Sequence, residues 1–231
     1  RTLFPQVRLL SETEVVLGGR IHFFFSNWKA LSCDPWILQT VQGFQLEFFA
    51  PPVQGSLPPD LHFSLPDQKT ISGEIQTLLH KGAVALSVPY LGGFVSCVFL
   101  VDKRGGGSRL VFNLKSFNGW LVYRHFKMEG IHLLQDILQP GDWMVRLALQ
   151  DAYLSVPIFP PHRRFLQFFW RGHCYEYLIL PFGLSSAPWC FTKLLKPVAE
   201  HLQARGVCLI IYLDDIIIMT QFQSMAILHL E

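Results

Sequence analysis

The sequence predicts an α+β domain with an antiparallel sheet and helices packed on one face. Residues 71–79 carry apolar side chains at helical spacing, whereas residues 144–149 and 209–219 have the apolar and β-branched composition of strands. A helix over residues 186–205 is expected between the last two strand segments. This order of strand, strand pair, helix and hairpin favours a sheet with helices on one side.

Length and composition indicate a folded chain. Its 231 residues suit one large domain or two small ones, and 50% of them are hydrophobic, which is enough for a sizeable core. The formal net charge of +2 does not by itself indicate a nucleic-acid partner, although Lys103-Arg104 and Arg163-Arg164 form local basic clusters.

The five cysteines are widely spaced, odd in number and without a CxxC pair, which argues against a zinc site and against a disulfide framework. Reduced thiols are typical of the cytoplasm or the nucleus, and no signal peptide is evident, so we expect a protein that is not secreted. No apolar run reaches the ~18 residues of a membrane span. We therefore expect no membrane partner.

We expect residues 1–59 to form an aromatic-rich N-terminal extension that ends in a proline-rich linker, and residues 60–231 to form the main domain. The main domain begins with the helix at 71–79, which Gly82 can end. Strands at 95–101 and 110–114 follow, joined by a basic, glycine-rich loop. Such a loop can close over a polyphosphate, or it can be an ordinary solvated turn; the loop alone favours the turn.

The third part of the chain alternates strands and helices. A strand is expected at 144–149, and an antiparallel pair at 164–170 and 174–180. For the helix at 186–205, Ser185 or Ser186 can act as the N-cap, and Pro197 predicts a kink or a break.

The last hairpin carries the most informative residues, Tyr212-Leu213-Asp214-Asp215. Two adjacent carboxylates stand between two apolar runs, which predicts a hairpin with paired acids at its tip. Paired acids held by rigid strands are suited to divalent cations.

Four ordered segments, residues 109–118, 151–158, 180–188 and 212–215, resemble the fingers and palm of a reverse transcriptase. A closer resemblance is to the DIRS-like retrotransposons, which integrate with a tyrosine recombinase. It rests on Gly18-Gly19-Arg20, Trp28, Asp34-Pro35-Trp36, Gly141-Asp142-Trp143 and residues 161–165.

The resemblance implies template-directed DNA synthesis. The implied partners are an RNA or DNA template with its primer and deoxynucleotide triphosphates, and the implied cofactors are two Mg²⁺ or Mn²⁺ ions about 4 Å apart. In the family these ions are held by an aspartate at the end of the first palm strand and by the hairpin acids. Asp214 and Asp215 match the latter pair.

The resemblance also implies roles for other residues. Lys103 and Arg109 match cations that hold the incoming triphosphate, Tyr153 matches the aromatic residue that excludes a 2′-hydroxyl, and Asp151 lies in the same nucleotide-binding segment. Phe182 and Gly183 match a turn against the nucleotide, and Asn118 and Tyr212 match positions beside template and primer. Taken without the resemblance, Tyr153 and Phe182 are by default core aromatics, because the chain is rich in phenylalanine.

Position 148 departs from the family pattern. The first palm motif has an aspartate three residues before the Asp-Ala-Tyr triplet, and this sequence has Ala148 there. Asp151 is an unsuitable substitute, because three residues along a strand span about 10 Å and reverse the face. Asn113, where related elements often have aspartate, is a milder change.

We therefore expect a reverse transcriptase domain whose catalysis is impaired. We also expect it to be cut after the Tyr212–Asp215 hairpin, so that the thumb is absent. The alternative is a non-catalytic remnant that binds nucleic acid or a protein.

Overall fold

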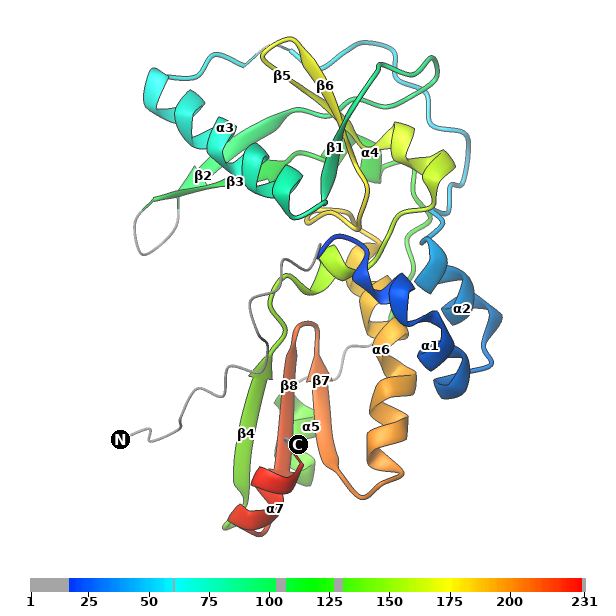
Figure 1. Ribbon diagram of the computed structural model, residues 1–231, viewed down its shortest axis with the longest axis vertical. Helices are drawn as coiled ribbons and strands as arrows, with labels where there is room; N and C mark the ends of the chain where they lie inside the picture. The colour runs from blue at the N-terminus through cyan, green and yellow to red at the C-terminus, as the bar shows by residue number, and fades with distance from the viewer. Residues whose placement is uncertain (1–16, 60, 103–106, 127–130, 230–231) are drawn as a thin grey trace.

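The computed structural model describes residues 17–59, 61–102, 107–126 and 131–229, which form an upper and a lower half in Figure 1. The upper half contains α3 (Leu65–His80), β1 (Val84–Ser87), β2 (Val98–Asp102), β3 (Ser108–Phe112), α4 (Lys115–Asn118), β5 (Gln167–Trp170) and β6 (His173–Tyr177). The lower half contains α5 (Ile131–Ile137), β4 (Trp143–Ala148), α6 (Ala187–Gln203), β7 (Cys208–Tyr212), β8 (Asp215–Thr220) and α7 (Gln223–Leu228). Helices α1 (Phe25–Leu31) and α2 (Pro35–Gln42) lie beside the junction of the two halves.

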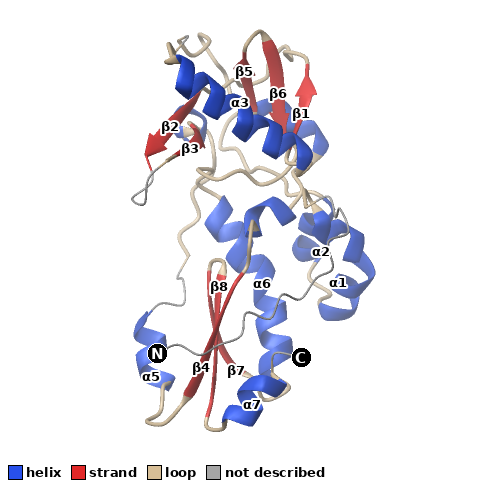
Figure 2. Cartoon of the chain, turned by 60° about the vertical axis from the view of Figure 1, so that its left-hand side comes forward, coloured by secondary structure: helices blue, strands red, loops and turns tan. Residues whose placement is uncertain are grey.

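The strands form three sheets with the orders β1-β6-β5, β2-β3 and β4-β8-β7, and each pairing is antiparallel. The predicted α+β class with an antiparallel sheet is confirmed. In the lower sheet, Leu209, Ile211 and Ile218 pack with residues of α6, which covers that face. Figure 2 shows α6 alongside the three strands.

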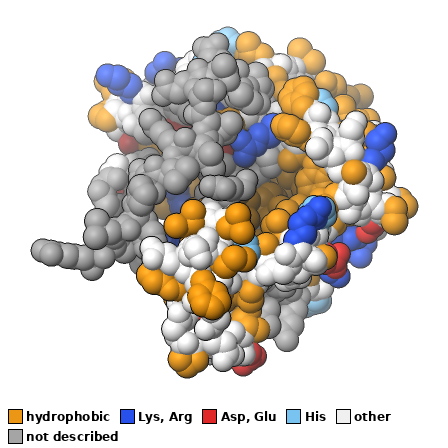
Figure 3. Space-filling view, turned by 60° about the horizontal axis from the view of Figure 1, so that its bottom comes forward, with side chains coloured by type: hydrophobic (Ala, Val, Ile, Leu, Met, Phe, Trp, Pro, Cys, Tyr) orange, Lys and Arg blue, Asp and Glu red, His pale blue; other side chains and the backbone are white. Residues whose placement is uncertain are grey.

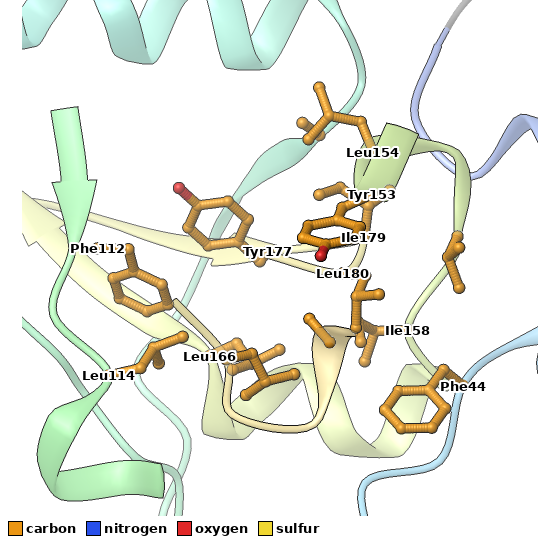
Figure 4. Packing of buried hydrophobic residues seen from close by; sticks show 14 of the residues in the cluster. Phe44, Phe112, Leu114, Tyr153, Leu154, Ile158, Leu166, Tyr177, Ile179 and Leu180 are labelled. Atoms are coloured by element: carbon orange, nitrogen blue, oxygen red, sulfur yellow. The ribbon is translucent and has the colours of Figure 1, made fainter. Parts of the chain in front are cut away.

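One large hydrophobic cluster holds the upper half and the junction together. Side chains from distant segments, such as Phe44, Phe112, Tyr153 and Tyr177, converge in it (Figure 4). Phe112 and Tyr177 stack with ring centroids 4.8 Å apart. The cluster thus joins the segment before residue 59 to the segments after it.

Residues 17–59 contact the later part of the chain through backbone hydrogen bonds and close packing. Asp34 caps α2 by accepting from the Trp36 amide at 2.8 Å, and the Phe44 amide donates to the Pro157 carbonyl at 2.8 Å. A Cβ at Gly18 would lie 2.1 Å from the Gly82 carbonyl oxygen, so the backbones cross where only glycine fits. The domain boundary at residue 59 stays a prediction.

Several element bounds differ from the sequence predictions. The strand expected at 95–101 begins only at Val98, because Val95 instead forms an isolated parallel bridge with Gln167. The helix expected at 71–79 already begins at Leu65, since the Ser64 hydroxyl accepts from the Asp67 amide at its N-terminus.

Helix α6 runs through Pro197 without a break. The proline removes one backbone donor, but the buried residues Cys190, Phe191 and Leu194 hold the helix against the core. Ser186 occupies the N-cap position, as predicted, although among the described residues its buried hydroxyl has no hydrogen-bond partner. No helix in the described ranges is long and apolar enough to cross a membrane.

Candidate functional site

The turn between β7 and β8, which carries Asp214 and Asp215, points toward the upper half of the molecule (Figure 1). Tyr212 pairs with Asp215 across the hairpin, and Leu213 has a positive φ of 55° in the turn between them. The Leu149 amide donates to the Asp214 carbonyl at 2.8 Å, which fixes the turn against the end of β4. The predicted hairpin with acids at its tip is therefore present.

Ala148 is directly opposite Asp215 in the pairing of β4 with β8. Side chains of directly opposed residues lie on the same face of an antiparallel sheet, with Cβ atoms about 5 Å apart. Position 148 is thus beside the acids, where a third carboxylate would complete the group. The methyl group of Ala148 offers no ligand atom.

Arg146 also lies beside the acids, and it was not among the residues predicted for the site. Its Nε donates to Asp215 Oδ1 at 2.9 Å and its Nη2 to Oδ2 at 2.8 Å, a bidentate fork on one carboxylate. The hydrogen bond and the charge of Asp215 raise the pKa of Arg146 further above its usual value. The spacing of two residues from position 148 was the signal, because residues i and i+2 of a strand share a face.

These residues do not fit a pair of divalent cations. Ala148 supplies no donor, and both oxygens of Asp215 accept from Arg146. Among the described residues, no group of three or more His, Cys, Asp or Glu side chains is positioned to hold a metal ion. Asp214 is exposed at the turn and is the carboxylate that this geometry leaves for a cation.

Asp151 takes part in a different interaction. Lys81 Nζ lies 2.7 Å from its Oδ2, and Asp151 has a left-handed φ of 52° at the start of the 3-10 helix η2 (Ala152–Ser155). The ion pair links the end of α3 to the segment that follows β4. Its use in nucleotide binding stays a prediction.

Tyr153 belongs to the core, where it is 9% exposed and contacts Phe191 at a centroid distance of 5.3 Å. Burial raises the pKa of its hydroxyl to about 12, so the phenol stays neutral. Its ring lies 5.1 Å from that of Phe182, which is exposed. The two predicted nucleotide-side aromatics are therefore in contact.

Asn118 holds the turn that contains Gly183. Its Nδ2 donates to the Gly183 carbonyl and its Oδ1 accepts from the Ser185 amide, both at 2.9 Å. Gly183 has a φ of 91°, and a Cβ there would lie 3.3 Å from the Phe112 carbonyl oxygen. Asn118 and Gly183 thus form one unit, in which Asn118 sets the conformation of the turn.

The remaining predicted residues lie apart from this unit. Arg109 is exposed on β3 in the upper half and is opposite Val101, whereas Lys103 lies outside the described residues. Tyr212 is exposed at the hairpin. On the face seen in Figure 3, Lys and Arg side chains are scattered among hydrophobic ones, without a continuous basic patch over the described surface.

Comparison with known proteins identifies the family. The family model described as reverse transcriptase (RNA-dependent DNA polymerase) matches residues 101–231, which is more than half of the chain. The chain belongs to the reverse transcriptase family. This family uses divalent metal ions in general.

Curated relatives are polyproteins of mobile elements. The chain is 26% identical over 167 residues to the retrovirus-related Pol polyprotein from transposon gypsy of Drosophila melanogaster, covering 70% of this chain and 16% of that protein. It is 27% identical over 135 residues to the transposon Tf2-3 polyprotein of Schizosaccharomyces pombe, covering 58% of this chain and 10% of that protein. It therefore spans a small part of the relatives that it matches.

Solved structures with the same fold include the prototype foamy virus protease-reverse transcriptase, with a TM-score of 0.66, 19% identity, and coverage of 80% of this chain and 24% of that one. A foamy viral protease-reverse transcriptase solved with double-stranded DNA aligns with a TM-score of 0.61 and 19% identity, covering 80% of this chain and 31% of that one. The predicted fold of reverse transcriptase fingers and palm is confirmed.

Proposed function

We propose that this chain is the fingers and palm of a reverse transcriptase from a DIRS-like retrotransposon, and that its lineage performs template-directed DNA synthesis by two-metal phosphoryl transfer. We further propose that this copy is impaired because Ala148 occupies the position of the first acid. The observation that carries the proposal is the register of Ala148 opposite Asp215, beside Asp214. A missing carboxylate at that point removes a ligand from the centre of the acid group.

The proposed partners are a template with its primer and deoxynucleotide triphosphates. Two structures of a foamy viral protease-reverse transcriptase, which has the same fold, were solved with double-stranded DNA, and this supports a nucleic-acid partner for this chain. In the proposal, Arg109 and Lys103 hold the triphosphate, and Tyr153 and Phe182 form the wall beside the sugar. Asn118 contributes by fixing Gly183 rather than by touching the template itself.

Two of the residues on which the DIRS-like assignment rests have structural roles in this fold. Gly18 is required by the close approach to Gly82, and Asp34 caps the helix that contains Trp36. The five cysteines, all free in the structure, support the proposed location in the cytoplasm or the nucleus.

The alternative function is a binding domain without catalysis. It is favoured by the same observation, since the fold is intact while the acid group lacks a member. Affinity for a primer-template should then fall steeply with salt and weaken in Arg109→Ala, with exposed Lys69→Ala on α3 as a control of equal charge change. Salt-independent binding would exclude this alternative.

A primer-extension assay with Mg²⁺ or Mn²⁺ tests the catalytic proposal. We expect the chain as given to extend a primer poorly or not at all, and Ala148→Asp to raise extension. Asp214→Ala in the Ala148→Asp background should abolish what is gained. Robust extension by the unmodified chain that is lost in Asp214→Ala would overturn the proposed impairment.

A further inference from the structure

The ion pair between Arg146 and Asp215 changes what the acid group can bind. The guanidinium of Arg146 is a fixed positive charge that satisfies both oxygens of Asp215. A divalent cation that used Asp215 as a ligand would have to share or displace these two hydrogen bonds. In the structure, this carboxylate already has a cation.

Arg146, Ala148 and Asp215 are neighbours on one face of the lower sheet. Arg146 and Ala148 lie on the same face of β4, and Asp215 is opposite Ala148 on β8. A carboxylate introduced at position 148 would lie two residues from Arg146 on that face. It would give Arg146 a second acidic partner as well as giving a metal ion a third ligand.

The contribution of the ion pair to folding stability is small. The Arg146 side chain is 69% exposed, and pairs of this kind contribute little to folding stability in water. Repulsion is the larger effect, because a positive charge within a few ångströms of a divalent ion disfavours binding even when both are hydrated. Arg146 therefore acts on cation affinity more than on the fold.

We propose that Arg146 occupies Asp215 as an internal counter-cation and keeps divalent metal ions from the hairpin. The inference rests on the proposed function, in which the two acids descend from a metal site. Arg146 is then a positioning residue that keeps the carboxylate of Asp215 from binding a metal ion. One consequence is that Ala148→Asp alone restores metal binding only in part. Removal of the Arg146 charge is needed for the rest.

The test compares Mn²⁺ affinity in two variants, Ala148→Asp and Ala148→Asp with Arg146→Gln, by isothermal titration calorimetry. We expect the second variant to bind Mn²⁺ about tenfold more tightly, because a unit charge beside the ion is removed. Equal affinity in the two variants, including no binding in either, would overturn the proposal. Circular dichroism establishes that both variants are folded.

Two control variants sharpen the comparison. In the Ala148→Asp background, Arg146→Lys keeps the charge but loses the planar fork, so Mn²⁺ affinity should stay within about twofold of Ala148→Asp alone. Arg171→Gln removes an exposed arginine from the upper half and should leave the affinity unchanged. A tenfold gain in Arg171→Gln would mean that the net charge of the protein, rather than the positive charge beside the hairpin, controls binding, and would contradict the proposal.

A second measurement observes the fork directly. In protein labelled with ¹⁵N-arginine, the Nε–H resonance of Arg146 should shift in Asp215→Asn and remain in place in Asp214→Asn. The opposite result would show that Arg146 pairs with Asp214. Neither measurement requires polymerisation, so a gain in Mn²⁺ affinity without primer extension would support this inference while contradicting the proposed polymerase function.

Discussion

The upper half of the chain and the edge of the lower sheet are built in opposite ways. Strand β6 buries three of its five residues, Cys174, Tyr175 and Tyr177, in the upper half. Strand β4 buries none of its six, and Trp143, Met144 and Leu147 are exposed large hydrophobics. The strand that carries position 148 is therefore held chiefly by backbone pairing with β8.

This difference explains how the chain keeps its fold with an alanine rather than a carboxylate at position 148. A substitution in a close-packed interior changes stability, because neighbouring atoms lose contacts. A substitution at an exposed position of a strand edge changes chemistry with little effect on stability. Ala148 is exposed, so the identity of the side chain there has little effect on the core.

The largest effect is expected at the centre of the upper core. Phe168 is 0% exposed, whereas its neighbour Phe169 is 39% exposed on the opposite face of β5. Phe168→Ala should lower the free energy of unfolding by about 3–5 kcal/mol. Phe169→Ala should lower it by much less, and urea denaturation measures both. Equal losses would break the comparison, because they would mean that burial does not distinguish the faces.

An intermediate effect is expected at His162, which joins the first described residues to the core. Its Nδ1 accepts from the Leu46 amide at 2.9 Å, which requires a ring nitrogen without a proton. Burial, with the charge of Arg164 nearby, lowers the pKa of His162 in the folded state.

The sign of the pH dependence follows from that direction. Between the lowered folded pKa and the usual value of about 6.5, the unfolded chain binds more protons, so stability rises with pH. The contribution is fully present above about 6.5 and is lost as the pH falls through the folded pKa. Thermal melts at several pH values should show a weaker dependence in His162→Gln than in the exposed control His62→Gln. An identical dependence in both variants would contradict a role for this hydrogen bond.

The smallest effect on stability is expected at position 148 itself. Ala148→Asp should change the free energy of unfolding by only about 0.5 kcal/mol, because the side chain points into solvent beside Arg146. Urea denaturation of the two proteins measures the difference. A loss of several kcal/mol would place position 148 in a packed interior and remove the contrast with Phe168.

Much of the fold was predictable from local patterns. The apolar spacing near Ile71 and Ile75 predicted α3, and the β-branched runs on either side of Asp214 predicted the hairpin. The bounds of the elements were less predictable. Val95, for example, forms an isolated bridge with Gln167 instead of extending the strand that its sequence favours. The continuity of α6 through Pro197 depends on buried tertiary contacts, which the helix propensities of individual residues do not describe.

The sequence by itself determined the family pattern, the paired acids and the alanine at position 148, since these depend on residue type and order. Only the tertiary structure decided what the remaining charges do: Lys81 pairs with Asp151, and Arg146 pairs with Asp215. Both ion pairs join residues about 70 positions apart in the sequence. Strand register and the packing of distant segments determine which of these side chains meet. The order of residues predicted an acid group without a carboxylate at position 148. The tertiary structure showed that the guanidinium of Arg146 is bound to the carboxylate of Asp215.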